Sequence, residues 1–149
     1  TLYTHTMKCT SYTVVHVDIY QVPDSAFRLQ LDSLVAGFPW QHFSSLGAQP
    51  GLECDKGNLF LQIVRVLNIS RPKAFLLENV PGLLGMTETY QTIVAALENA
   101  GYQVTTEICS ARGLTATNRK RLFFVGIRKD LAKSNFEFHF VPDFKLMAR

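Results

Sequence analysis

The chain has 149 residues, of which 47% are hydrophobic and 18% are charged. This length and composition suit one folded domain with a real core and exclude a disordered or fibrous protein. No apolar run reaches the roughly 18 residues that span a bilayer, and no secretory signal opens the chain, so we expect an intracellular protein without a membrane anchor. The net charge of +3 is compatible with a polyanionic partner but does not require one.

The first predicted elements are two strands and a helix. Residues 14–19 and 33–38 are short apolar runs, which are typical of strands buried on both faces of a parallel sheet. A helix follows, with Asn58 as its expected N-cap and Pro72 beyond its end. Its apolar residues recur at helical spacing and form one face: Leu59, Phe60, Ile63, Val64 and Leu67.

A third strand and a second helix come next. Residues 74–77 form another continuous apolar run, closed by Glu78 and Asn79. The second helix is expected to start at a cap supplied by Thr87 or Thr89 and to end before a glycine. Its inner face consists of Ile93, Val94 and Leu97, and the glycine is Gly101.

The last two strand-like runs are residues 103–109 and 121–127, on either side of a polar loop. The resulting order β-β-α-β-α-β-β predicts an α/β sheet that is parallel in its middle. The final two strands are close enough in sequence to form an antiparallel edge. Ligands of such sheets bind beyond the carboxyl ends of the strands. Residues 18–19, 38–41 and 78–80 are expected at those ends, and residues 118–121 enter the last strand from the same side.

The three cysteines do not form a recognisable metal site. Cys9, Cys54 and Cys109 are odd in number, and their spacing matches no zinc pattern. We therefore expect reduced thiols and no metal ion.

Three motifs resemble those of the DNA cytosine-5 methyltransferases. Residues 37–41 read G-F-P-W-Q and are followed by Phe43 and Ser44, where the family has G-F-P-C-Q-x-F-S. Residues 78–82 (ENVPG) resemble the family's E-N-V motif. Residues 118–123 (NRKRLF) resemble its Q-x-R-x-R-x-F motif, although Thr117 stands where the motif's glutamine is expected. The order and spacing of the motifs make this a far more specific signal than one short motif.

The resemblance implies an internal piece of a catalytic domain. The expected fold is a partial Rossmann-like, S-adenosylmethionine-dependent methyltransferase fold, mostly parallel with an antiparallel last strand. Residues 18–128 would form the partial catalytic domain. Residues 1–17 match nothing that we can name, and residues 129–149 would begin a linker toward a target-recognition domain.

The family flips cytosine out of the duplex, attacks C6 with a cysteine thiolate and transfers a methyl group to C5. By position, Trp40 replaces that cysteine. Glu78 would be the buried acid that contacts N3 and N4 of the base, and Arg121, supported by Arg119, would hold its O2 edge.

The other family positions concern the cofactor and the DNA. S-adenosylmethionine would contact Asp18, Ile19 and Pro39, with Asp18 holding its adenine. Double-stranded DNA is the implied partner, and we expect the protein to act as a monomer. Residues that would line the base pocket or touch DNA are Phe38, Gln41, Ser44, Ser45 and Asn79.

Trp40 is the main departure from the family. An indole cannot replace a thiolate nucleophile, and tryptophan is far larger than cysteine. Cys54 and Cys109 occupy no family position, and no F-x-G-x-G cofactor loop precedes Asp18. We therefore expect a methyltransferase-like chain without methyltransferase activity.

Two alternatives remain open. The basic segment at residues 118–121, together with a Trp40 that turns outward to stack on a base, would suit a non-catalytic module that binds nucleic acid or a partner. An unrelated Rossmann-like enzyme is the other alternative, but no glycine-rich phosphate loop supports it.

Overall fold

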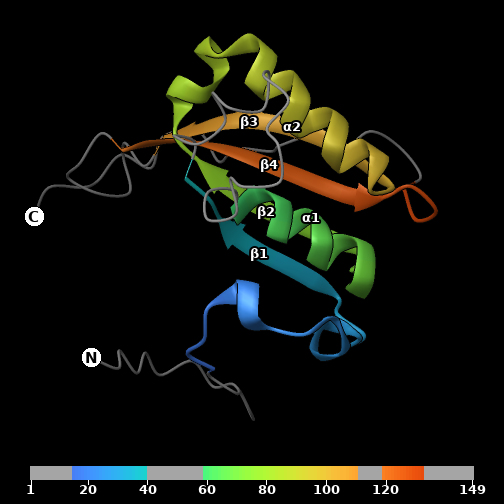
Figure 1. The fold of residues 1–149 in the computed structure, drawn as a ribbon. Coiled ribbons are helices and arrows are strands. Elements are labelled where there is room, and N and C mark those ends of the chain that lie inside the picture. The colour runs from blue at the N-terminus through green and yellow to red at the C-terminus, as the bar shows by residue number, and fades with distance from the viewer. Residues whose placement is uncertain (1–14, 40–58, 111–118, 133–149) are drawn as a thin grey trace, which may run out of the picture.

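The computed structural model describes residues 15–39, 59–110 and 119–132. Within these ranges the chain folds into a sheet with helices packed against it (Figure 1). The strands are β1 (Ser33–Gly37), β2 (Ala74–Asn79), β3 (Tyr102–Ser110) and β4 (Lys120–Arg128), and the α-helices are α1 (Leu59–Ser70) and α2 (Thr87–Asn99). Three short 3-10 helices complete the described elements: η1 (Ile19–Gln21), η2 (Asp24–Phe27) and η4 (Pro81–Gly85).

The sheet has the strand order β1-β2-β4-β3. β1 and β2 are parallel, whereas β4 runs antiparallel to both of its neighbours, β2 and β3. The predicted α/β class and the antiparallel last strand are therefore confirmed. One detail differs from the prediction, because of the last two strands β4 lies inside the described sheet and β3 lies at its edge. β4 carries the fully buried Leu122 and Phe124, while the second half of β3 is mostly exposed, as suits an edge strand.

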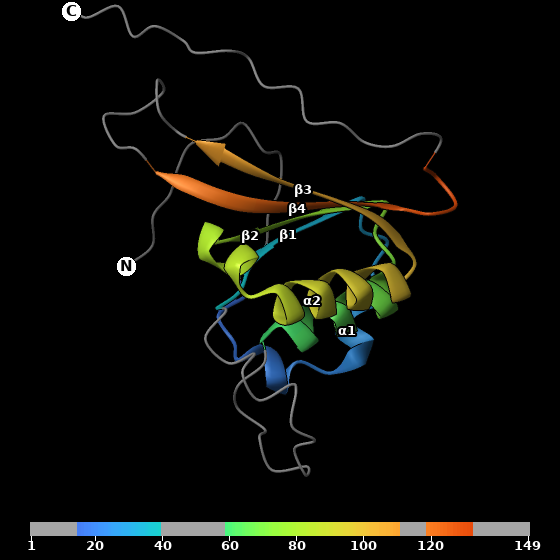
Figure 2. The same cartoon turned by 90° about the horizontal axis from the view of Figure 1, so that it is seen from above.

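Both α-helices cover the same face of the sheet (Figure 2). The side chains of β2 alternate, so that Phe75 and Leu77 point toward the helices and are buried. Gly126, opposite Phe75 in the register, makes room for that ring, because a Cβ at Gly126 would lie 2.1 Å from it. No described helix covers the other face of the sheet, where Val35 is 71% exposed.

The predicted helices form, with differences at their ends. In α1 the face of Phe60, Ile63 and Leu67 is buried as expected, but Leu59 is exposed, and the expected cap Asn58 lies outside the described residues. In α2 the expected threonine cap is wrong, because the helix starts at Thr87 and Met86 occupies the N-cap without a side-chain bond. Gly101 follows α2 with a φ of 96°, as a glycine after a helix often does.

The predicted strand at residues 14–19 is wrong for the described residues 15–18, which form no strand. Val15 and Val17 are exposed, since no described strand pairs with this segment and no element buries its apolar side chains. Asp18 instead accepts a hydrogen bond from the Tyr20 amide at 3.1 Å and caps η1. Among the helices of the described ranges, none has the length and apolar character needed to cross a membrane.

Candidate active site

Three elements bring the predicted motifs together at one end of the sheet. β1 and β2 are parallel and in register from Ser33 and Ala74 to Gly37 and Glu78, so their carboxyl ends lie side by side. β4 enters from the same end because it is antiparallel to β2. Together they surround an open hollow of about 290 Å³, whose lining residues are Phe38, Pro39, Glu78, Asn79, Val80, Arg119 and Arg121.

Glu78 forms the charged centre of this hollow. Its Oε1 lies 2.5 Å from Nε of Arg121 and 4.0 Å from a terminal nitrogen of Arg119. Glu78 is opposite Phe123 in the register, and Arg121, two residues earlier in β4, therefore shares the same face of the sheet. Gly37 lies beside this carboxylate, since a Cβ there would be in van der Waals contact with Oε2 of Glu78 at 3.4 Å.

The exposure of this cluster differs from the sequence expectation. The Glu78 side chain was expected to be buried, yet it is 40% exposed, compared with 25% for Arg121 and 62% for Arg119. The hollow is open, so the carboxylate remains partly in contact with solvent beside the bonded arginine. Two cations face a single anion, so the cluster keeps one formal positive charge that can attract a nucleic acid strand.

Asn79 ties the two strand ends together. It is 3% exposed, its Nδ2 donates to the Phe38 carbonyl at 2.9 Å, and its Oδ1 accepts the Val80 amide at 2.8 Å. The sequence reading placed Asn79 against substrate or DNA and missed this bridging contact. The alternation of side chains along β2 could have indicated that Asn79 is buried, because Asn79 continues the inward-pointing series of Phe75 and Leu77.

Phe38 lies at the hollow mainly through its backbone. Its ring packs on Phe60 and Phe124, with centroid distances of 5.2 and 6.3 Å, and it is 6% exposed. Pro39, the next residue, is exposed at the rim. The buried Phe38 ring therefore fixes the end of β1, from which the motif continues.

The predicted cofactor residues Asp18 and Ile19 are not among the residues that line the hollow. Asp18 is exposed, and one of its carboxylate oxygens caps η1. Its remaining acceptor capacity fits the N–H and O–H donors of an adenosyl group, so the chemistry of the predicted role is compatible with this structure. Ile19 is half-buried, and its carbonyl faces α1, where Arg65 donates to it.

The remaining predicted residues have separate outcomes. Trp40, Gln41, Ser44 and Ser45, like Cys9 and Cys54, lie outside the described residues. Cys109 lies in β3 opposite Arg121 in the register, but it is not among the residues that line the hollow. Desolvation by burial, helped by the charge of Glu107, raises the pKa of its thiol. A raised pKa makes Cys109 a poor thiolate source. The described part of the chain contains no group of three or more His, Cys, Asp or Glu residues arranged to hold a metal ion.

Comparison with known protein families gives one consistent match. The family model described as C-5 cytosine-specific DNA methylase matches residues 2–147. The chain is 41% identical to the type II methyltransferase M.FnuDI of Fusobacterium nucleatum over 110 residues, which are 72% of this chain and 32% of that protein. It is also 41% identical to M.NlaX of Neisseria lactamica over 116 residues, which are 76% of this chain and 35% of that protein. The chain thus spans about a third of the length of these curated relatives.

Solved structures support the fold. A mutant of DNMT2 from Spodoptera frugiperda superposes with a TM-score of 0.64 and 19% identity over 87% of this chain and 41% of that chain. A methyltransferase described as a putative DNA modification enzyme of an E. coli prophage superposes with a TM-score of 0.58 and 22% identity over 77% of this chain and 33% of that chain. These likenesses show a methyltransferase fold of the partial Rossmann-like kind that the sequence predicted.

Proposed function

The chain belongs to the C-5 cytosine-specific DNA methylase family, and on that premise we propose that it forms the cytosine-facing part of a catalytic domain acting on double-stranded DNA. By family it is a DNA (cytosine-5-)-methyltransferase. We further propose that the chain with Trp40 does not itself transfer a methyl group.

One observation supports the cytosine site most directly: Glu78 lies at the carboxyl end of β2, in the hollow, with Arg121 bound to it and Arg119 beside it. A flipped cytosine presents an amino group, a ring nitrogen and a carbonyl oxygen along one edge. A carboxyl group can accept from the amino group and share a proton with the ring nitrogen. Arg121 has five donors, of which Glu78 and the Lys120 carbonyl engage two, so others remain for the carbonyl oxygen.

The proposed loss of activity follows from the chemistry at position 40. Methylation at C5 requires a nucleophile that bonds to C6 and raises the electron density at C5, and that later leaves as the C5 proton is removed. In the family, S-adenosylmethionine supplies the electrophilic methyl group. Trp40 carries no group that can form and then release the bond to C6, so Glu78 and Arg121 would hold a base that is not activated.

Methyl incorporation tests this proposal. The chain, a Glu78→Ala variant and a buffer blank are each incubated with duplex DNA and S-adenosylmethionine carrying a tritiated methyl group. We expect equal, background incorporation in all three. Incorporation by the chain above that of Glu78→Ala would contradict the proposed inactivity and would require a nucleophile other than a cysteine at position 40.

A second candidate function is a non-catalytic module that binds nucleic acid. The observation that favours it is the exposure of Arg119, which lines the hollow, and of Lys120, the next residue at the start of β4. We expect DNA binding that weakens as salt rises, because each neutralised phosphate releases counterions. Weakening by Trp40→Ala, measured by fluorescence anisotropy, would support stacking of the ring on a base. Binding that is indifferent to salt and to this change would exclude the module.

The remaining assignments follow from the same family. We propose residues 18–128 as the catalytic portion and residues 129–149 as the approach to a target-recognition region. The protein would act on DNA as a monomer, in the cytoplasm of a bacterium or the nucleus of a eukaryote.

A further inference from the structure

Arg65, on the outward face of α1, is the most extensively bonded side chain outside the hollow among the described residues. Its Nε donates to Oδ1 of Asp24 at 2.7 Å, and Nη2 contacts the same oxygen at 2.7 Å and the Val22 carbonyl at 2.5 Å. Its Nη1 donates to Gln62 Oε1 at 2.8 Å and to the Ile19 carbonyl at 3.5 Å. Four of the five N–H donors of the guanidinium therefore make hydrogen bonds, and Nη2 also forms an ion pair with Asp24.

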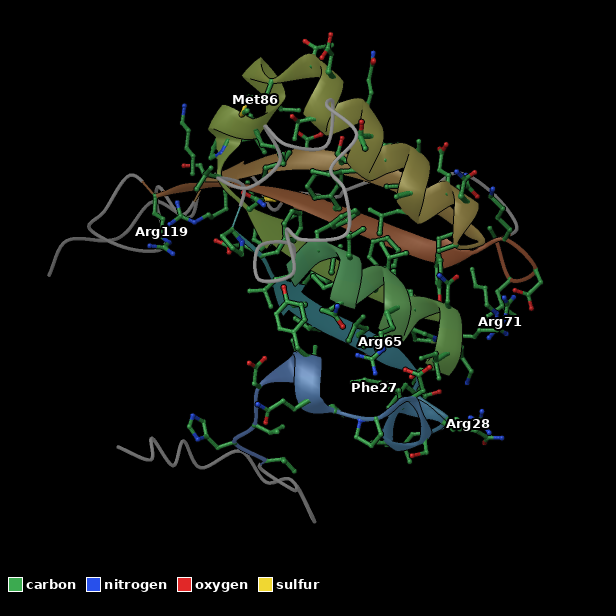
Figure 3. All side chains as sticks on the ribbon, in the orientation of Figure 1. Phe27, Arg28, Arg65, Arg71, Met86 and Arg119 are labelled. Carbon is green, nitrogen blue, oxygen red and sulfur yellow. The ribbon has the colours of Figure 1, made fainter. Side chains whose placement is uncertain are left out.

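Three of these acceptors belong to the segment of residues 18–27, which comes more than 40 residues earlier in the chain. Figure 3 shows Arg65 pointing from α1 toward Phe27 at the end of that segment. The guanidinium carbon lies 5.2 Å from the centre of the Phe27 ring, a cation–π contact. At the end of α1, the Ser70 hydroxyl donates to the Phe27 carbonyl. Arg65 and Ser70 thus fasten the segment along the length of the helix.

Within the described part of the chain, few other contacts hold this segment. η1 and η2 contain no buried residues, and no described strand pairs with residues 15–18. A segment that buries no side chains of its own depends on such polar contacts for its orientation. When these contacts are lost, the segment opens locally and the rest of the fold stays intact. Lysine could not replace Arg65, because an ammonium group has three donors at one point and cannot reach several carbonyls at once.

We propose that Arg65 is a positioning residue that holds Asp18 and Ile19 where the adenosyl end of the cofactor binds. This inference rests on the proposed function, and it takes Asp18 and Ile19 as the S-adenosylmethionine contacts that the family resemblance implies. Arg65 bonds directly to the carbonyl of Ile19, and η1, which Asp18 caps, is fixed by that bond and by the bond to Val22. Arg65 acts through these residues, from the side of the segment that faces α1.

Hydrogen exchange on the whole chain tests the anchoring. In Arg65→Lys, peptides covering residues 19–28 should exchange about tenfold faster or more, since several charge-assisted bonds are lost, while peptides from β2 and β4 keep their protection. Arg28→Lys is the matched control, because Arg28 is exposed just after η2, and it should leave both regions unchanged. Unchanged exchange at residues 19–28, or an equal increase through the sheet, would overturn the proposal.

A double-mutant cycle tests the positioning. S-adenosylmethionine is titrated while protection of residues 18–27 is followed in the chain, Arg65→Lys, Asp18→Asn and the double variant. We expect each single change to raise the half-saturating concentration about tenfold and the double variant to add little, because both act on one contact. Strictly multiplicative effects would mean that Arg65 does not act through Asp18.

The two claims fail in different ways. In one outcome, S-adenosylmethionine protects nothing in any variant while Arg65→Lys still loosens residues 19–28. The assignment of Asp18 and Ile19 to the cofactor then fails, and the anchoring role of Arg65 stands. If the cofactor binds with the same affinity in the chain and in Arg65→Lys, the cofactor assignment stands and the positioning role is overturned.

Discussion

The two ends of the sheet use charged residues in opposite ways. At the amino end of the parallel strands, two cations each pair with a carboxylate of their own. Arg128 contacts Asp130 at 2.7 Å and donates to the Arg71 carbonyl at 2.6 Å, and Lys73 contacts Asp32 at 2.7 Å. In Figure 3, Arg71 lies at this end of the molecule and Arg119 at the other. Two matched ion pairs therefore lie at the amino end.

The carboxyl end is not balanced in this way. Arg119 and Arg121 share the single carboxylate of Glu78. The strand ends there are joined by a neutral side chain, the buried amide of Asn79. Different residues therefore hold the fold and face the ligand at this end. Asn79 holds the two strand ends together, while the charged residues remain available to a ligand.

Asn79→Ala should have the largest effect on stability. The change removes a buried amide, leaves the Phe38 carbonyl without its donor and opens a small cavity, so we expect a loss of about 3 kcal/mol in the free energy of unfolding. Urea denaturation measures it. Asn99→Ala is the control, because Asn99 is exposed at the end of α2, and it should change stability by no more than about 0.5 kcal/mol. Equal losses in both variants would show that Asn79 is not the link between the strand ends.

Tyr102→Phe should have a moderate effect at the opposite end. The buried Tyr102 hydroxyl donates to the Pro72 carbonyl at 2.8 Å, and its loss should cost about 1 kcal/mol. Desolvation by burial raises the pKa of Tyr102 above its ordinary value of 10.0, so its contribution to stability is complete below pH 10 and is lost as pH rises from there toward the raised value. Chemical denaturation at pH 8 and pH 11 should show this alkaline loss in the chain and a smaller one in the variant. An identical pH dependence would contradict the assignment.

The matched ion pairs at the amino end should have the smallest effect. A side-chain hydrogen bond from Lys73 lowers the pKa of Asp32, and one from Arg128 lowers the pKa of Asp130, both below the ordinary value of 3.8. These pairs therefore stabilise the fold above pH 3.8, and their contribution is lost as pH falls through the lowered values. A double Asp32→Asn, Asp130→Asn variant should show a slightly shallower acid dependence of its melting temperature. Because the pairs are exposed, a large drop at pH 7 would contradict the account.

Much of the fold could be predicted because its signals are local. The spacing of Phe60, Ile63 and Leu67 predicted α1, short apolar runs predicted β1 and β2, and strand-like runs around a polar loop predicted β3 and β4. The prediction of a strand at residues 14–19 was wrong, because an apolar run forms a strand only where a neighbouring strand can pair with it. Residues 15–18 form no strand, and η1 and η2, which follow them, are held by polar contacts that are distant in sequence.

The site was predicted in part for the same reason. Glu78, Arg119 and Arg121 were identified by motif, and the structure brings them together. Arg65 was missed because nothing near it in the sequence indicates that its acceptors lie 41 to 46 residues earlier. The partial exposure of Glu78 could not be predicted either, since it depends on how three strand ends are spaced.

Release of tritium from C5 of cytosine in duplex DNA, without a methyl donor, tests the central claim most directly. In Trp40→Cys, a thiolate can add to C6, C5 can take a proton from water and lose its triton, and the thiolate can leave, which restores cytosine. The account predicts release by Trp40→Cys, none by the chain with Trp40, and none when Glu78→Gln is added to Trp40→Cys. Release that does not depend on position 40 or on Glu78, or no release by Trp40→Cys when it is saturated with DNA, would contradict the assignment of the hollow as a cytosine site.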